Sequence, residues 1–238
     1  MIYITGDKHG DYSFLDCFCE DKKTTINDIL IILGDAGINY YLNYLDYRLK
    51  DKIKKCPITL FCIHGNHEER PENINTYITK KFAGGLVYYE EDYPNILFSI
   101  DGEIYDFNDN KTISIGGAYS VDKEYRLANS KWYPSEQPSD EIKKRVVESL
   151  KKQNNEIDII LSHTCPCKYE PTEMFLPYID QSKVDKSTEY FLDEIEKNTK
   201  YNKWYCGHYH TDKEIDKIRF MMHDIDELYD KTKIKKIK

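Results

Sequence analysis

The stretch Ile31-Ile32-Leu33-Gly34-Asp35-Ala36-Gly37 decides the fold. Three large aliphatic residues in succession are typical of a strand covered on both faces, because a half-exposed strand alternates apolar and polar residues. Gly34 ends the apolar run, and a carboxylate follows directly at Asp35. Since ligands of α/β proteins gather at the carboxyl ends of the strands, this position indicates a functional role for Asp35.

Four further apolar runs end in the same kind of residue. The runs at 2–5, 58–63, 157–161 and 202–206 are followed by Asp7 and His9, by Asn66 and His67, by His163, and by His208 and His210. This recurrence predicts an α/β protein in which several strands deliver Asp, Asn and His side chains to one region.

Helices are expected between these strands. Apolar residues at helical spacing predict helices over 13–19, 40–55, 139–152 and 187–197. Ser139 is a suitable N-cap for the third of them. In the second helix, the residues expected in the core are Leu42, Leu45, Leu49 and Ile53.

The remaining segments are interpreted as strands or loops. Residues 96–100, 103–107 and 111–115 are typical of antiparallel strands, and 215–222 of one more strand. Residues 80–91 are expected to be a connection without regular structure, and 121–138 and 164–185 to be long loops. Because loops of this length often serve function, the second is expected to form a lid or a substrate wall.

Composition limits the classes of function. Hydrophobic residues make up 40% of the 238, enough for one α/β domain over residues 1–238. The net charge of −8 disfavours a broad nucleic-acid surface, which is normally basic, so nucleic acid is considered as a substrate only. The basic segment Lys231 to Lys238 is interpreted as a solvated terminus, with a contact to phosphate or acidic lipid as the alternative.

The start of the chain and its cysteines bear on its location. No basic and apolar leader precedes the first strand, and no apolar run approaches the roughly 20 residues that span a membrane. The seven cysteines are an odd number without a C-x-x-C pair, which argues against a disulfide framework. We expect a soluble, cytoplasmic protein without a membrane partner.

The residues at the strand ends form a set of metal ligands. They are Asp7, His9, Asp35, Asn66, His163, His208 and His210. Carboxylate, imidazole and amide donors suit Mn, Fe, Ni or Zn better than Ca or Mg alone. Seven ligands exceed one tetrahedral site and fit two ions that share a carboxylate.

In this pattern the sequence resembles the calcineurin-like metallophosphoesterases. That family has the motifs G-D-x-H-G, G-D, G-N-H-[DE], a lone His and G-H-x-H in this order. Here they are Gly6 to Gly10, Gly34-Asp35, Gly65 to Glu68, His163, and Gly207 to His210. The resemblance extends nearly from end to end of the chain and suggests a bacterial or phage-type member.

The resemblance implies a fold, a cofactor and a reaction. The fold would be a four-layer αββα sandwich of two mixed β-sheets flanked by helices. The first of two metal ions, with manganese the leading choice, would bind Asp7, His9, Asp35 and His210. The second would bind Asp35, Asn66, His163 and His208. A hydroxide between the ions would attack phosphorus in line, and His67 would protonate the leaving oxygen or stabilise the phosphoryl group.

The chain departs from the serine/threonine protein phosphatases of that family. Those enzymes carry Asp-Arg-Gly shortly after the second motif, where this chain has Ala36-Gly37-Ile38-Asn39-Tyr40. The Arg often found before Gly-Asn-His is replaced by His64. His67 therefore needs another partner and phosphate another cation. The candidates are Arg126, Lys8 and Tyr119, although Arg126 could also be a solvated surface charge.

Several functions remain open from the sequence. The leading one is a phosphomonoesterase whose substrate is a phosphate ester of unspecified identity. A phosphodiesterase or nuclease would use the same centre, with Trp132 and Tyr133 stacking on bases, although packing within the loop is the simpler role for those rings. Two further possibilities are a metal-bound binding module without turnover, and a thiol protein built on the pairs Cys17/Cys19 and Cys165/Cys167.

Overall fold

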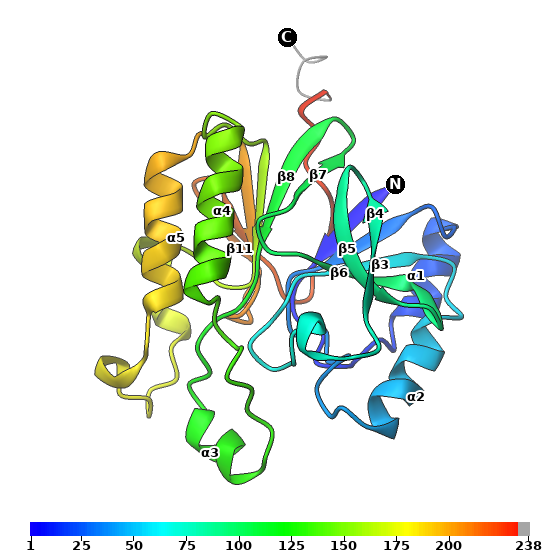
Figure 1. Cartoon of the computed structure of the whole chain (residues 1–238), viewed down its shortest axis with the longest axis horizontal. Coiled ribbons are helices and arrows are strands. Elements are labelled where there is room, and N and C mark those ends of the chain that lie inside the picture. Colours follow the sequence, from blue (N-terminus) through cyan, green and yellow to red (C-terminus); the bar gives the residue numbers. More distant parts are fainter. Residues whose placement is uncertain (233–238) are drawn as a thin grey trace.

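Two β-sheets packed face to face, with helices on both outer faces, form the protein (Figure 1). The structure is a computed structural model that describes residues 1–232. The four layers agree with the predicted αββα sandwich, and both sheets mix parallel and antiparallel pairs.

The first sheet consists of the six strands nearest the N-terminus and of β13 from near the C-terminus. Its order is β13 (Ile225–Glu227), β1 (Ile2–Thr5), β2 (Ile29–Ile32), β3 (Thr59–Cys62), β6 (Tyr93–Ser99), β5 (Gly85–Glu90) and β4 (Ile78–Phe82). The four strands β1, β2, β3 and β6 run parallel to one another. The helices α1 (Leu15–Lys22) and α2 (Tyr44–Ile53) cover its outer face.

The second sheet consists of the strands between residues 104 and 220. Its order is β11 (Lys213–Ile215), β12 (Ile218–Phe220), β10 (Lys203–Cys206), β9 (Ile159–Ser162), β8 (Asn110–Ile115) and β7 (Ile104–Phe107). The helices α4 (Asp140–Lys152) and α5 (Ser187–Asn198) cover it. The short helix α3 (Lys123–Ala128) projects at the bottom of Figure 1, and the short 3-10 turns are η1 (Pro71–Asn73), η2 (Cys167–Tyr169), η3 (Thr172–Met174) and η4 (Gln181–Lys183).

The core has layers on both faces of each sheet, because side chains alternate between the two faces along every strand. Successive side chains of a strand point to opposite faces. In β2, Ile31 therefore packs between the sheets with Leu161 of β9, and Leu30 packs under the helices with Ile53 of α2. Residues 30–33 are all fully buried. The expected strand covered on both faces is confirmed.

The segment 80–91 belongs to a hairpin, so the prediction of an irregular connection is wrong. The strands β4 and β5 pair antiparallel around Ala83 and Gly84, whose φ angles are 47° and 85°. The strand β4 lies at the edge of the sheet and carries Lys80 and Lys81, which suit an exposed edge. Because these two lysines interrupt the apolar residues of β4, the sequence lacks the pattern by which a strand is recognised.

The strands predicted between 96 and 115 do not form one antiparallel unit. The strands β7 and β8 pair antiparallel as predicted, but β6 lies in the other sheet, parallel to β3. The chain changes sheet at Asp101-Gly102, where Gly102 has a φ of 85°. The strand β6 is buried along most of its length, which suits an interior position in a sheet.

The helix predicted over 40–55 begins four residues later, at Tyr44. Asn43 caps it by accepting a hydrogen bond from the Leu45 backbone N–H at 2.9 Å. Leu42 lies before this cap with a φ of 49° and an exposed fraction of 48%, so its predicted place in the core is wrong. The third helix begins as predicted, with the Ser139 hydroxyl accepting from Ile142 N–H at 3.3 Å.

Two other segments contain more regular structure than predicted. The expected loop 121–138 includes α3. The strand expected over 215–222 is a hairpin of β11 and β12, with Asp216 at a φ of 53° in the turn. Short elements of three to six residues lack the length over which a periodic pattern can be recognised.

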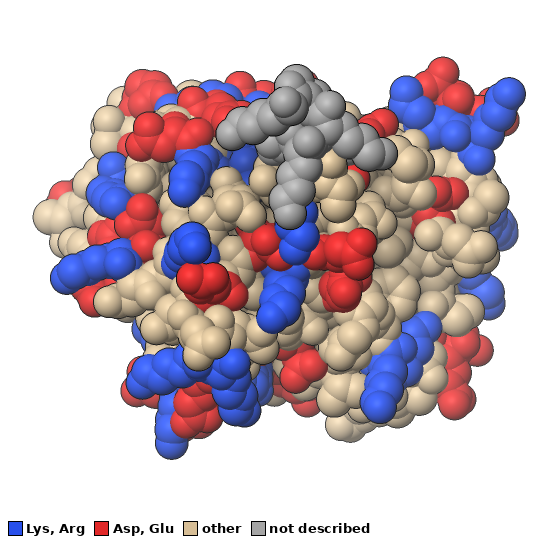
Figure 2. All heavy atoms as spheres, turned by 90° about the horizontal axis from the view of Figure 1, so that it is seen from above, with Lys and Arg blue, Asp and Glu red and all other residues tan. Residues whose placement is uncertain are grey.

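The surface carries interspersed charges. Figure 2 shows Lys and Arg side chains next to Asp and Glu across one face of the molecule. Of the predicted basic tail, Lys231 pairs with Asp158 at 2.6 Å, and residues 233–238 lie outside the described residues. None of the helices in residues 1–232 has the length and apolar character needed to cross a membrane.

Candidate metal centre

The ends of parallel strands bring the predicted ligands together. Asp7 and His9 follow β1, Asp35 follows β2, Asn66 follows β3, His163 follows β9, and His208 and His210 follow β10. The two sheets meet at these residues, since His163 Nε2 of the second sheet lies 3.6 Å from Asp35 Oδ2 of the first.

Asp7 and Asp35 form the buried centre of the site. Each is only 2% exposed. Asp35 Oδ1 accepts a hydrogen bond from the His67 backbone N–H at 2.9 Å. A Cβ atom on Gly65 would lie 2.1 Å from Asp35 Oδ1, and one on Gly207 would lie 2.1 Å from Asp7 Oδ1. The glycine of one motif therefore makes room for the acid of another.

The ligand atoms fall into overlapping groups. Within each of three groups they lie within 4.8 Å of one another: Asp7 with His9 and His210, His9 with Asp35 and His67, and Asp7 with Asp35 and His163. Each carboxylate takes part in two of them, as expected between neighbouring ions. The ring of His208 packs against that of His163, with their centroids 5.0 Å apart.

Two lone pairs face each other between His163 and Asn66. His163 Nδ1 lies 2.7 Å from the carbonyl oxygen of Leu33, so the neutral imidazole, the form that binds a metal, carries its proton on Nδ1 and a lone pair on Nε2. Asn66 Nδ2 donates to Ser120 Oγ at 2.8 Å, which directs Asn66 Oδ1 towards His163 Nε2, also 2.8 Å away. Two acceptors at this distance repel each other unless a cation binds both.

A second convergence involves His9 and His210. Their Nε2 atoms lie 3.0 Å apart, and His210 Nε2 lies 3.3 Å from Asp7 Oδ2. Imidazole nitrogen and carboxylate oxygen together suit first-row transition metals. The residues present in this structure therefore fit a pair of metal ions.

Backbone strain coincides with the ligands. His9, Asp35, His208 and His210 have φ angles of 46°, 45°, 67° and 49°. The left-handed region costs a residue with a Cβ atom about 1–2 kcal/mol. Strain of this kind is retained where the surrounding structure needs it, and it often marks functional turns.

The electrostatics of the site suit metal binding near neutral pH. Burial by itself would raise the pKa of Asp35, but His67 and His163 outweigh it and hold that pKa below its ordinary value. Burial lowers the pKa of His208 to about 3. A ligand must offer a lone pair, so an ionised carboxylate and a neutral imidazole are the forms that bind metal.

His67 has a cation and an acid beside it. Arg126 Nη2 lies 2.7 Å from His67 Nδ1 and donates to it, which leaves the imidazole proton on Nε2. Arg126 Nε donates to Asp122 Oδ1 at 2.7 Å, and the same oxygen lies 4.0 Å from His67 Nε2. Arg126 is 8% exposed, so its interpretation as a solvated surface charge is wrong.

The other two substrate-binding candidates lie differently. Lys8 Nζ donates to the carbonyl of Met222 at 2.7 Å and lies 5.4 Å from the centre of the Phe14 ring. The Lys8 side chain therefore points to the backbone of Met222 and not into the candidate metal site. Tyr119 lines a cavity together with Asp35 and His67.

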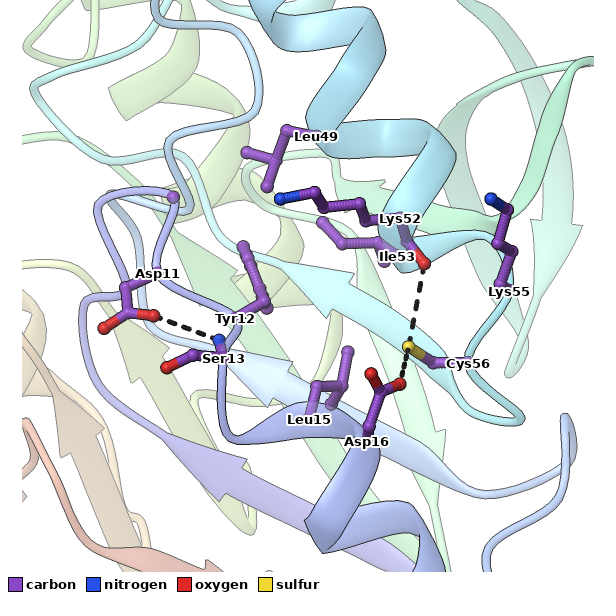
Figure 3. Close-up of a pocket in the computed structure, with 11 residues that line it drawn as sticks. Asp11, Tyr12, Ser13, Leu15, Asp16, Leu49, Lys52, Ile53, Lys55 and Cys56 are labelled. Carbon is purple, nitrogen blue, oxygen red and sulfur yellow. Dashed lines mark hydrogen bonds between the residues drawn. The ribbon is translucent and has the colours of Figure 1, made fainter.

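Two cavities beside the ligands share His67. The loop cavity, of about 460 Å³, is bounded by Asn66, His208 and the segment 174–184. The tyrosine cavity, of about 500 Å³, is bounded by Tyr40, Tyr41 and Arg126. A third hollow, of about 570 Å³, lies between α1 and α2 and is lined mainly by residues outside the ligand set (Figure 3).

Two residues contact the site without a role predicted from the sequence. Asp122 precedes Arg126 by four residues, the spacing of a helical ion pair, but its segment was expected to be irregular. Glu68 accepts hydrogen bonds from the N–H groups of Gly37 and Gly65 at 3.1 Å each and so joins two ligand turns. Burial raises the pKa of Glu68 to about 8.

The thiols and the loop aromatics lie outside the ligand groups. The cysteines in the described chain are free, and none belongs to the three groups of candidate ligands. Trp132 stacks under Lys123 Nζ at 4.2 Å, and the Tyr133 hydroxyl donates to the Tyr40 carbonyl at 2.9 Å. These contacts agree with packing within the loop.

One comparison with a solved structure shows a shared fold. The crystal structure of TT1561 of Thermus thermophilus has a TM-score of 0.50 at 12% identity, covering 93% of this chain and 87% of that one. The protein of unknown function AQ665 from Aquifex aeolicus has a TM-score of 0.33 at 15% identity, covering 69% of this chain and 80% of that one. A comparison with curated protein sequences returns no match.

Residues 1–212 match the family described as calcineurin-like phosphoesterase. This range contains every candidate ligand from Asp7 to His210. The chain therefore belongs to the calcineurin-like phosphoesterases, hydrolases that cleave phosphate esters with a binuclear metal centre.

Proposed function

We propose that the chain hydrolyses a phosphate monoester. Asp35 would be shared by two metal ions, of which one would also be held by Asp7, His9 and His210 and the other by Asn66, His163 and His208. When bound, such ions lower the pKa of a coordinated water and neutralise charge on the phosphoryl oxygens. The mixed N and O donors suit manganese, with Fe, Ni and Zn as alternatives.

The observation that carries this proposal is the contact of His163 with Asn66. Nε2 of the one and Oδ1 of the other are 2.8 Å apart and both present lone pairs, while their remaining polar atoms are already hydrogen-bonded to the protein. A turn with a purely structural role would pair a donor with an acceptor. An ion between these atoms and Asp35 removes the conflict.

Arg126 is suited to hold the phosphate. Its Nη1 atom has no hydrogen-bond partner within residues 1–232, although Nη2 and Nε are paired. A guanidinium offers parallel N–H groups that match two phosphate oxygens. A monoester has more free oxygens and more charge than a diester, so it gains more from this contact. Arg126 thus takes the place of the arginine that the motifs lack.

His67 acts on the leaving group. In the free protein the His67 imidazole is neutral and carries its proton on Nε2, because Nδ1 accepts a hydrogen bond from Arg126. When Arg126 turns to the phosphate, Nδ1 is free to take up a proton, and Nε2–H then serves as an acid towards the leaving oxygen. General acid catalysis of this kind contributes about 10²–10⁴-fold. Asp122, near Nε2, orients the ring.

The second candidate is a phosphodiesterase. Two cavities share His67, which would allow one substituent of phosphorus on each side of the reacting bond. The tyrosine cavity would then bind the group that stays on the phosphate, and the loop cavity the group that leaves.

Two chromogenic esters separate these functions. The full chain is stripped with a chelator, reloaded with Mn, Ni, Fe or Zn, and assayed on 4-nitrophenyl phosphate and bis(4-nitrophenyl) phosphate, with metal content measured. We expect the monoester to have a kcat/KM at least about tenfold higher. A higher value for the diester would favour the phosphodiesterase, and a metal-loaded chain inert on both would favour a binding module.

A further inference from the structure

The loop cavity has one apolar wall and one wall of ligands. It opens beside Asn66, His67 and His208. Its opposite wall comes from the loop after β9 and consists of Met174, Phe175, Leu176, Tyr178, Ile179 and Val184. A group attached to the phosphate and placed in this cavity would bury its apolar surface against these side chains.

The charged groups of this cavity are carboxylates. Asp122, Glu170 and Glu189 line it, and no Lys or Arg is found in the lining that the structure describes. Two of these acids are already paired with cations next to the cavity, Glu170 with Lys186 at 2.6 Å and Asp122 with Arg126 at 2.7 Å, so neither cation is free to bind a second anion. A second anionic group on the substrate would face these acids in a partly desolvated space, where like charges repel more strongly than in water.

Glu189, in the lining of the cavity, leaves one acceptor unused. It is 4% exposed and lies in the first turn of α5. Its Oε1 accepts from the Thr164 hydroxyl at 2.8 Å, but Oε2 has no hydrogen-bond partner among the described residues. Buried polar atoms are nearly always paired, so an unpaired oxygen in a cavity wall indicates a place for a ligand donor.

We propose that the loop cavity binds the alcohol half of the substrate, and that this alcohol is uncharged, largely apolar and carries an N–H or O–H donor for Glu189. This inference rests on the phosphoesterase function proposed above and adds the class of substrate. Phosphate esters of anionic alcohols, and esters within long polyanions, are disfavoured, because no Lys or Arg in the described lining could pair with a second anionic group. The apolar wall supplies affinity, and Glu189 supplies selectivity.

Three matched aryl esters test the inference. 4-Carbamoylphenyl, 4-acetylphenyl and 4-carboxyphenyl phosphate have nearly the same shape and end in a donor, a methyl group and an anion. They are assayed on the manganese-loaded full chain, with 4-nitrophenyl phosphate as the general substrate. The variant Glu189→Met removes the acceptor, and Glu194→Met makes the same change at an exposed position of the same helix.

We expect the carbamoyl ester to exceed the acetyl ester about tenfold in kcat/KM, mainly through KM, in the unaltered chain and in Glu194→Met. In Glu189→Met this ratio should fall to about one, and the carboxy ester should be the poorest substrate of the unaltered chain. Thermal unfolding confirms that both variants are folded.

Three results would overturn the inference while leaving the phosphoesterase function intact. The first is the same carbamoyl-to-acetyl ratio of kcat/KM in Glu189→Met and in Glu194→Met. The second is a kcat/KM for the carboxy ester equal to that for the acetyl ester. The third is turnover of 4-nitrophenyl phosphate without turnover of the three probes. If 4-nitrophenyl phosphate itself is not hydrolysed with any of the four metals, the proposed function fails, and the inference fails with it.

Discussion

The metal centre and the hollow between α1 and α2 differ in how their polar groups are paired. In the hollow, Asp11 accepts from the Ser13 backbone N–H at 3.0 Å, and Asp16 accepts from the Cys56 thiol at 3.4 Å (Figure 3). At the metal centre, His163 Nε2 faces Asn66 Oδ1 with no donor between them. These two acids of the hollow are paired within the protein, whereas the centre brings two acceptors together when His163 is neutral, as a cation site does.

This difference shows that volume does not identify the site. The hollow, of about 570 Å³, is larger than either cavity beside the ligands. Chemistry is expected where buried groups converge without partners, since such groups are costly unless a ligand or ion satisfies them. Matched substitutions in the two regions test this distinction.

The largest effect is expected from exchanging a carboxylate for an amide. Asp35→Asn removes the charge that the two ions would share, so we expect kcat/KM to fall on the order of 10³-fold, together with loss of bound metal. Asp16→Asn makes the same change in the hollow and should alter neither quantity. Metal analysis and turnover of 4-nitrophenyl phosphate check both variants. Full activity in Asp35→Asn would refute the assignment of the centre.

His67→Gln should have the next largest effect. It keeps a polar side chain but cannot donate a proton, so kcat should fall roughly 10²–10³-fold with little change in KM. Metal content should remain at the level of the unaltered chain. The exposed His223, which lines neither cavity beside the ligands, provides the control His223→Gln. Loss of metal in His67→Gln would instead make His67 a ligand.

Arg126→Lys tests the phosphate contact. Lysine keeps the charge but loses the paired N–H groups, so we expect KM to rise about tenfold, with metal content unchanged. Arg48→Lys, at an exposed position of α2, is the matched control. Steady-state kinetics on the monoester measure both. An unchanged KM in Arg126→Lys would remove Arg126 from the substrate site.

A separate prediction concerns stability instead of turnover, namely the pH dependence of unfolding of the metal-free chain. Burial raises the pKa of Glu189 to about 7, above the ordinary glutamate value of 4.5. Between these two values the folded state binds more protons than the unfolded state, so the free energy of unfolding decreases as the pH rises towards 7. The contribution of Glu189 to the free energy of unfolding is fully present below pH 4.5 and is lost as the pH rises through the pKa of the folded state, about 7.

Urea unfolding at pH 5 and pH 8 measures this contribution. Between pH 5 and pH 8 the free energy of unfolding should decrease by up to about 3 kcal/mol in the unaltered chain. The decrease should be smaller in Glu189→Gln, whose side chain cannot ionise. Glu194→Gln should follow the unaltered chain. A decrease of equal size in all three proteins would show that Glu189 does not carry it.

Local patterns were enough to predict the main strands and the polar residues that gather at their ends. A strand buried on both faces has an unbroken apolar run, and residues 31–33 show it without any reference to the rest of the chain. Asp35 follows such a run directly. The hairpin of β4 and β5 was missed because an edge strand is recognised by its neighbours, and its lysines resemble a loop.

The sequence by itself determined the layered α/β fold, the order of the motifs and the kinds of donor atom at the strand ends, because each depends on a few adjacent residues. Only the tertiary structure decided that Arg126 contacts His67, that Lys8 is directed to Met222, and that Glu189 lines the loop cavity with an unpaired oxygen. Those contacts join residues far apart in the chain, and their geometry follows from how helices and loops pack on the sheets.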